Sequence, residues 1–292
     1  MDNIAIVVLN YLNYKDTIEC VESIFNDKYL EKQIIIVDNG SSNDSKVKIE
    51  ERFGNVEGIH LLCNATNEGF ARGNNIGIRY ATDTLGCYFV MLVNNDTIFK
   101  DPEMITVLME AYEEGVGVIG PRIVAADGSE QNPGRNELIR SNLKQDLYYR
   151  QKIANIRLKQ SNLYKGLRKV NIFKKKKGPR LVVQKSVTSP NLVLHGACML
   201  LTKDYFTYYP YLFPKTFLYY EENILTILTH KVGLSKKFIN TTYIFHKEDQ
   251  SSEMSFSNDK GFRTKYLLES IRAAKDMYSL PYDALKNTYF TD

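Results

Sequence analysis

One short apolar run followed by three polar residues constrains the fold of this chain more than any other stretch. Residues 88–93 read Tyr-Phe-Val-Met-Leu-Val, which is long enough for a strand and too short for an ordinary helix. A continuous apolar run suits a strand covered on both faces, as in a parallel sheet between helices. The run ends at Asn94, Asn95 and Asp96. Ligands of open α/β sheets bind beyond the carboxyl ends of strands, and a carboxylate there suits a divalent cation, although Asn and Asp are also common turn residues.

Strands and helices alternate along the first part of the chain. Apolar runs at 4–9, 34–37 and 59–63 predict three further strands, and helical spacing follows each of them. Such alternation implies βαβ crossovers and a mostly parallel sheet. Polar residues follow three of the four strands, at Asn10, Asp38 and Asn94 to Asp96. We expect these strand ends to converge on one rim of the sheet and to form a site there.

Regular alternation fades after Pro121. Residues 192–201 read as a strand broken by His195-Gly196-Ala197, and residues 238–245 as an edge strand ending at His246. Glu221 and Glu222 precede a helix, and residues 260–278 have the pattern of a charged amphipathic helix.

Several classes of protein are excluded by what the sequence lacks. The four cysteines lie far apart without a Cys-x-x-Cys pair, which argues against a zinc site or disulfide framework and fits a reducing compartment. Neither a Gly-x-Gly-x-x-Gly fingerprint nor a Walker-type loop is present. The N-terminus lacks the features of a secretion signal, and no run approaches the roughly 18 apolar residues of a membrane span. We therefore expect a cytoplasmic protein.

A strongly basic segment interrupts an acidic chain. Residues 140–185 contain fifteen Lys or Arg and one acid, Asp146, so this segment carries +14. The net charge is +4, and the remainder therefore sums to −10. Apolar residues are spaced among these charges roughly as in an amphipathic helix, which favours docking on an anionic membrane surface. A solvated loop is the second explanation, especially for Lys174 to Lys177, and a nucleic-acid contact is a distant third.

Taken together, the motifs resemble those of the family 2 glycosyltransferases. The likeness rests on Val-Leu-Asn-Tyr at 8–11, Val-Asp-Asn-Gly-Ser at 37–41, the stretch from Asn67 to Gly77, and Val-Asn-Asn-Asp-Thr at 93–97. Downstream, Gly-Ala-Cys-Met-Leu at 196–200, Tyr-Glu-Glu at 220–222 and His246 continue it. The resemblance covers residues 3–130 and 190–275 and is strongest to enzymes of bacterial surface polysaccharide synthesis, including rhamnosyltransferases.

This resemblance implies a GT-A type α/β fold, inverting chemistry, and Mg²⁺ or Mn²⁺ as cofactor. It implies that Asp38 contacts the nucleotide, that Asn67 and Arg72 help enclose it, and that Asn10, Asn94 and Asn95 belong to the nucleotide-sugar site. The family's usual Asp-x-Asp motif has Asn94 in first position here, so Asp96 becomes the principal metal ligand. His246 is a candidate metal or diphosphate ligand, or alternatively a structural histidine. His195 and His230 are interpreted as structural.

The two adjacent acids are the candidates for catalysis. A carboxylate within hydrogen-bond reach of an acceptor hydroxyl can act as general base. Glu222 takes the place of the second acid in the family's Glu-Asp pair and is assigned this role, with Glu221 as the fallback. Two acids also simply favour a helix N-terminus. The family commonly has Asp-Leu and then an Arg on this helix, whereas this chain continues with Asn223-Ile224-Leu225.

We therefore expect a nucleotide-sugar-binding α/β half at 1–133, a basic amphipathic insert at 134–190, an acceptor-side catalytic half at 191–258, and a C-terminal helical extension at 259–292. The expected donor is UDP- or dTDP-linked, with rhamnose the first guess. The expected acceptor is a glycan or a polyprenyl-linked precursor, reached from the inner face of the plasma membrane. A nucleotidyltransferase and a non-catalytic sugar-nucleotide-binding or scaffold protein are the alternatives.

Overall fold

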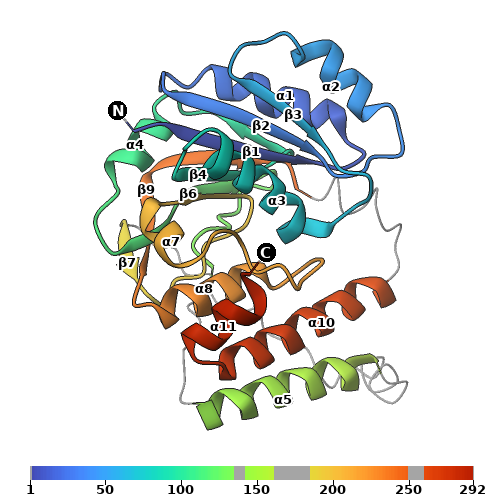
Figure 1. Ribbon diagram of the computed structural model, residues 1–292, viewed down its shortest axis with the longest axis vertical. Coiled ribbons are helices and arrows are strands. Elements are labelled where there is room, and N and C mark those ends of the chain that lie inside the picture. The colour runs from blue at the N-terminus through green and yellow to red at the C-terminus, as the bar shows by residue number, and fades with distance from the viewer. Residues whose placement is uncertain (1, 135–141, 161–184, 249–259, 292) are drawn as a thin grey trace.

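In the computed structural model the described residues are 2–134, 142–160, 185–248 and 260–291. The strands in these ranges form one nine-stranded sheet in the order β3-β2-β1-β4-β8-β6-β9-β5, with β7 paired to β9. Strands from before and after the basic segment share this sheet, so the two expected halves belong to one α/β unit (Figure 1).

The N-terminal part of the sheet is parallel, as the alternating pattern predicted. Its strands are β1 (Ile4–Asn10), β2 (Lys32–Asp38), β3 (Ile59–Cys63) and β4 (Phe89–Asn94). The helices between them are α1 (Tyr14–Phe25), α2 (Ser45–Phe53) and α3 (Gly69–Arg79), and α3 continues into a π-helical turn, η1 (Tyr80–Thr84).

The remaining strands make the sheet mixed. They are β5 (Thr97–Phe99), β6 (Val116–Ala125), β7 (Val187–Ser189), β8 (Cys198–Leu201) and β9 (Ser235–His246). β8 is antiparallel to both β4 and β6, while β9 is parallel to β6. The predicted edge position of β9 is wrong, because β5 and β7 pair with its other side. These two strands have three residues each, too few to give a pattern in the sequence.

Helices cover both faces of the sheet and create two cores. α1, α2 and α4 (Met104–Glu110) pack on one face. α3, α7 (Lys203–Tyr208) and α8 (Glu221–Lys231) pack on the other (Figure 1). Because apolar residues cover both sides, the central strands are continuously buried, which explains why their sequences are continuous apolar runs.

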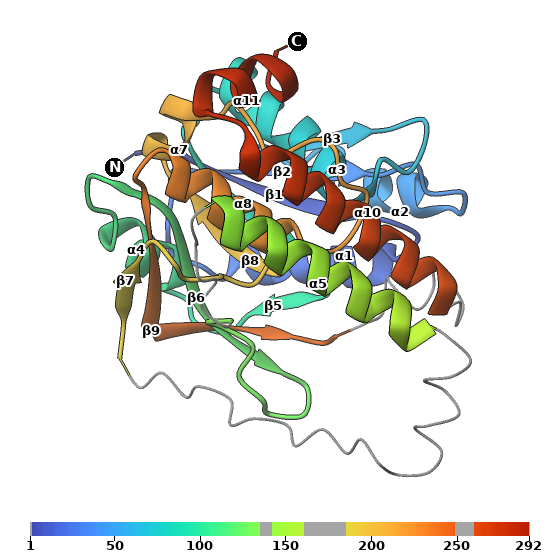
Figure 2. The same ribbon diagram turned by 90° about the horizontal axis from the view of Figure 1, so that it is seen from below.

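A helical layer lies beyond α8. It consists of α5 (Asn142–Gln160), α10 (Lys260–Ser279) and α11 (Tyr282–Tyr289). α5 lies alongside α10 in both views, and the buried Tyr149 ring lies 6.3 Å from that of Tyr278 (Figures 1 and 2). The predicted basic amphipathic helix is α5, and its apolar side packs on α10. Leu147 and Leu158 of α5 remain about half exposed. The rest of the basic segment, including Lys174 to Lys177, lies outside the described residues.

Strand pairing places the polar strand ends together, as expected. Asn10 is opposite Asp38, and Leu9 is opposite Asn94. β8 runs in the opposite direction, so the residues just before Cys198 lie at this same rim. His246 is the last residue of β9 and pairs with Thr97, so the end of β9 lies at this rim as well.

Candidate active site

The ends of β1 and β2 form a tightly bonded polar cluster. Asn10 Nδ2 donates to Asp38 Oδ2 at 2.6 Å, and Thr17 Oγ1 donates to Asn10 Oδ1 at 2.8 Å. The backbone N–H of Ser41 donates to Asp38 Oδ1 at 3.0 Å. Asn10 and Asp38 are both buried. The Asp38 carboxylate is therefore held in one orientation at the rim.

Asn67 joins the next loop to this cluster. Its Oδ1 accepts hydrogen bonds from Asn39 Nδ2 at 3.0 Å and from the Gly69 backbone N–H at 2.8 Å. Gly69 has φ +77°, and a Cβ there would lie 2.2 Å from the Phe217 carbonyl oxygen. The residue must therefore be glycine, since both the conformation and the close approach exclude a side chain.

Helix α3 begins at Gly69, so the stretch that begins with Asn67 is helical from its third residue onward. Arg72 lies in the first turns of this helix, half exposed, and its guanidinium is 2.6 Å from Glu68. Asn74 and Asn75 do not cap the helix start. Instead, Asn75 exchanges two hydrogen bonds with the backbone of Leu212, at 2.8 and 2.9 Å, and anchors the segment that leads to α8.

The polar residues after β4 separate into two kinds of environment. Asn95 Nδ2 donates to the Asn13 carbonyl at 3.2 Å and to Thr17 Oγ1 at 3.0 Å, so its amide holds the start of α1. Asn94 is partly exposed at the rim, and its backbone N–H donates to the Ala197 carbonyl at 2.9 Å. Asp96 is nearly buried, with 7% of its side chain exposed, yet its Oδ1 accepts no hydrogen bond.

His246 faces this unsatisfied oxygen. Its Nε2 lies 3.2 Å from Asp96 Oδ1, and its Nδ1 donates to Gln131 Oε1 at 2.8 Å. Gln131 Nε2 in turn donates to Glu248 Oε1. The bond to Gln131 places a proton on Nδ1 and leaves Nε2 facing Asp96, and metal-binding histidines typically donate their other ring N–H in this way. Asp96 and His246 are thus two adjacent candidate ligands.

His195 connects this pair to the candidate base. Its ring lies 5.8 Å from the His246 ring, and its neighbouring charges are Glu222, His246, Asp96 and Glu248. The Ala197 N–H donates to its Nδ1 at 3.1 Å, which leaves the proton on Nε2. Burial lowers the pKa of His195 and keeps its imidazole neutral. The sequence interpretation treated His195 as structural and gave no indication that these charged groups would surround it.

Glu222 lies beside the start of β8. The Gly196 N–H donates to Glu222 Oε1 at 3.2 Å, and a Cβ on Gly196 would lie 3.1 Å from that oxygen. Glu222 is partly exposed, so its carboxylate is fixed by the chain without being enclosed. Contacts therefore lead from Asp96 through His246 and His195 to Glu222, although Asp96 and His246 are 150 positions apart in the sequence.

Glu221 has a different environment from its neighbour. Its carboxyl faces a small enclosed space lined by apolar side chains that include Leu212, Phe213 and Leu225. Burial, with the charge of Glu222 as a second cause, raises the pKa of Glu221 to about 8. Glu221 is consequently protonated at neutral pH and carries no charge with which to accept a proton.

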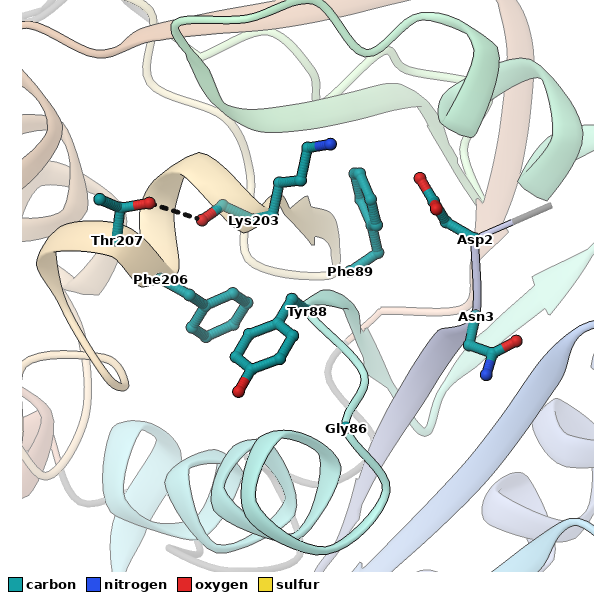
Figure 3. Close-up of a pocket in the computed structure, with 8 residues that line it drawn as sticks. All are labelled: Asp2, Asn3, Gly86, Tyr88, Phe89, Lys203, Phe206 and Thr207. Carbon is teal, nitrogen blue, oxygen red and sulfur yellow. Dashed lines mark hydrogen bonds between the residues drawn. The ribbon is translucent and has the colours of Figure 1, made fainter.

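A separate pocket lies at the opposite rim of the sheet, beyond the amino ends of β1 and β4 (Figure 3). It has a volume of about 410 Å³. Tyr88 and Phe206 meet edge to face there, with ring centroids 6.4 Å apart, and Lys203 reaches over the opening. None of the predicted site residues lines this pocket.

Two negative findings apply to the described residues. No group of three or more His, Cys, Asp or Glu side chains gathers there as a self-sufficient metal site. Within the same ranges, none of the helices combines the length and apolar character needed to cross a bilayer.

Comparison with known proteins identifies a family and several relatives of this chain. The model of the family described as "Glycosyl transferase family 2" matches residues 4–176. The chain is 20% identical over 288 residues to the low-salt glycan biosynthesis hexosyltransferase Agl10 of Haloferax volcanii, covering 98% of this chain and 81% of that protein. It is 25% identical over 100 residues to the dTDP-rhamnosyl transferase RfbF of Shigella flexneri, covering 34% and 32%. It is 26% identical over 128 residues to a glucosyl-dolichyl phosphate glucuronosyltransferase of Haloferax volcanii, covering 43% and 37%.

Proposed function

Because the chain belongs to glycosyl transferase family 2, we propose that it transfers one sugar from a nucleotide sugar to a glycan acceptor by a single, inverting displacement. Membership of this family establishes a glycosyltransferase and agrees with the GT-A type of α/β fold. The observation that carries the detailed proposal is the line of contacts from Asp96 through His246 and His195 to Glu222. It supports a leaving-group site and an acceptor site on one rim.

We assign the nucleotide to the ends of β1 and β2. There Asp38 is oriented by Asn10, and Asn67 and Arg72 flank it from the start of α3. Asn94 is assigned to the ribose and diphosphate, whereas the amide of Asn95 is hydrogen-bonded to Thr17 of α1. A rhamnose donor on dTDP or UDP remains the first guess, and similarity to a protein named as a dTDP-rhamnosyl transferase supports it.

The residues around Asp96 fit a divalent cation, Mg²⁺ or Mn²⁺. A nearly buried carboxylate oxygen without a hydrogen bond and an imidazole nitrogen 3.2 Å away form a donor pair of oxygen and nitrogen. Two protein ligands are enough, because such ions commonly take their remaining oxygens from substrate phosphates and water. When bound, the ion would neutralise charge on the departing diphosphate. Gln131 would keep His246 in the required tautomer.

Glu222 is the proposed general base. It is partly exposed at the rim and held by the Gly196 N–H, so that its second oxygen is available to an acceptor hydroxyl. Glu221 is a weaker candidate, since burial in apolar surroundings leaves it protonated at neutral pH. His195 lies between Asp96 and Glu222, and its Nε2–H is suited to donate a hydrogen bond to a negatively charged group of the nucleotide sugar.

For the acceptor we propose a lipid-linked precursor of a surface polysaccharide, presented at the inner face of the plasma membrane. One relative carries dolichyl phosphate in its name, which supports a lipid carrier. A groove of about 430 Å³ between α5 and α10 is lined by Arg150, Arg157, Arg272 and Lys275 together with Asp276, and this excess of positive charge would attract anionic headgroups. The wild-type protein should sediment with anionic vesicles at low salt, and its failure to do so would remove the membrane part of the proposal.

The decisive experiment is a panel of nucleotide sugars tested by thermal shift with and without Mn²⁺, followed by transfer assays with the donor that stabilises most. We expect one donor to raise the unfolding temperature in a metal-dependent way and to release a nucleoside diphosphate. Release of pyrophosphate instead would identify a nucleotidyltransferase. Binding without hydrolysis or transfer of any donor would favour the non-catalytic alternative.

A further inference from the structure

The turn before the two glutamates has an unusual backbone. Tyr219 and Tyr220 have φ values of +71° and +77°, so two successive non-glycine residues are left-handed. Bulky residues rarely adopt this conformation, and it persists only where surrounding contacts impose it. Tyr220 directly precedes α8, so its conformation sets the direction in which Glu221 and Glu222 leave the turn.

Side chains from α5 and α10 contact both of these tyrosines. Lys152 of α5 donates from Nζ to the Tyr220 hydroxyl at 2.8 Å and lies 4.0 Å from the centre of the Tyr220 ring. Arg263 of α10 lies 5.5 Å from the centre of the Tyr219 ring. Each left-handed tyrosine is therefore contacted by a cation from a different helix, in the geometry of a cation–π interaction.

The residues just before the turn are held in the same way. Ser270 of α10 donates from Oγ to the Leu218 carbonyl at 3.0 Å, and the Tyr266 ring lies 4.7 Å from that of Phe217. On its other side, the Phe217 carbonyl accepts the Phe70 N–H at 2.8 Å. The segment 217–220 thus connects the start of α3, on the donor side, with the two outer helices.

We propose that α5 and α10 hold the Tyr219–Tyr220 turn so that Glu222 faces Gly196, and that Lys152 is the main positioning residue. Lys152 suits this role because its ammonium group contacts Tyr220 and also lies 3.3 Å from the Tyr148 hydroxyl. The basic segment would then serve catalysis directly, in addition to any attraction of its charges to a membrane. The catalytic consequence rests on the proposed function, whereas the positioning of the turn does not.

The test uses the full-length protein without membranes, so that loss of vesicle binding cannot affect the result. Lys152→Met keeps the apolar stem and removes the charge and the donor. We expect kcat to fall about tenfold with the KM for the donor unchanged, because a misplaced base affects the chemical step. Amide hydrogen exchange in residues 217–224 should become faster. Lys152→Arg should recover part of both effects, since Arg can donate to the same hydroxyl.

The control is Lys286→Met, which removes a lysine that lies 5.9 Å from the Tyr282 ring on α11, away from the turn. It should change neither kcat nor exchange in 217–224. If Lys152→Met does not fold, Tyr220→Phe removes the hydroxyl acceptor and keeps the ring, and a smaller effect of the same kind is expected. Unchanged exchange of 217–224 in the folded variants would overturn the positioning role. If the wild type transfers no sugar but exchange accelerates, the proposed function fails while the positioning role stands.

Discussion

Asp96→Asn should make the unliganded protein more stable and at the same time remove its response to metal and nucleotide. The reason is the environment of the carboxylate, which is 93% covered and has an oxygen without a hydrogen bond. His246 Nε2 is 3.2 Å away but has no proton to donate, because the His246 proton is on Nδ1, which donates to Gln131. An amide has nearly the same shape and no charge to leave uncompensated.

The expected gain follows from the cost of an unsatisfied buried group, which is about 1–3 kcal/mol. Because Asp96 is close to the surface, we expect about 1–2 kcal/mol, equivalent to a rise of about 2–4 °C in unfolding temperature for each kcal/mol. In the wild type, a metal–nucleotide pair at about 100 times its Kd should add about 2.7 kcal/mol. Asp96→Asn should lose most of that increment. The variant should therefore be the more stable protein without ligand, and the wild type the more stable protein with ligand.

Thermal unfolding with and without Mn²⁺ and a nucleoside diphosphate measures both effects. Asp101→Asn is the matched control, since Asp101 accepts hydrogen bonds from Thr242 Oγ1 at 2.6 Å and from the Glu103 N–H at 3.0 Å. Removing that satisfied carboxylate should lower stability and leave the ligand response intact. The reasoning is refuted if Asp96→Asn is less stable than the wild type without ligand, or if it keeps the full ligand-induced shift.

Three further predictions concern the other end of the site. Glu222→Gln should abolish transfer while preserving nucleotide binding, and near-normal turnover would refute its role as base. Glu221 has a pKa of about 8 in the folded protein, against an ordinary value of 4.5, so between these values the folded state binds more protons than the unfolded state. The free energy of unfolding should therefore decline as the pH rises from about 4.5 to about 8. The decline can reach about 1.4 kcal/mol per pH unit, and urea unfolding of Glu221→Gln at pH 5.5 and 7.5 should show a flatter dependence; an unchanged slope would contradict this. Gly196→Ala places a methyl group 3.1 Å from Glu222 Oε1, and a displacement of a few tenths of an ångström should reduce kcat by about 3–10-fold without changing the donor KM. Unaltered kinetics of that variant would mean that Glu222 is free to move.

The polar rim could be predicted because its main signal is local. Each parallel strand is a buried apolar run that ends in Asn or Asp, and strand direction alone brings such ends together. Pairing of Asn10 with Asp38 and of Leu9 with Asn94 confirms this arrangement. The order of strands in the C-terminal half had no comparable signal. β9 appeared to be an edge strand because its neighbours β5 and β7 are too short to be recognised from three residues.

The geometry around Glu222 could not be predicted for a different reason. Left-handed turns are normally indicated by Gly or Asn, whereas Tyr219 and Tyr220 take this conformation through contacts with residues 152 and 263. Those contacts depend on the packing of α5 against α10, which sequence spacing does not reveal. The surroundings of His195 could not be predicted for a similar reason, because a single histidine in a strand-like stretch gives no indication of the charged groups that will surround it.

Hydrogen bonding distinguishes the buried rim residues whose polar atoms are bonded to the protein from the one that has an unbonded oxygen. Asn10, Asp38 and Asn95 have polar side-chain atoms bonded to neighbouring protein groups, which explains how the rim keeps its shape. Asp96 Oδ1 has no such partner despite its burial, and leaving it unbonded is costly unless a ligand completes it. Asn95 and Asp96 are adjacent in the sequence and both follow β4, yet the Asn95 amide nitrogen is hydrogen-bonded to the protein and Asp96 Oδ1 is not. We therefore infer that the third position of Asn94-Asn95-Asp96 carries the metal-dependent chemistry, while the second maintains the strand end that presents it.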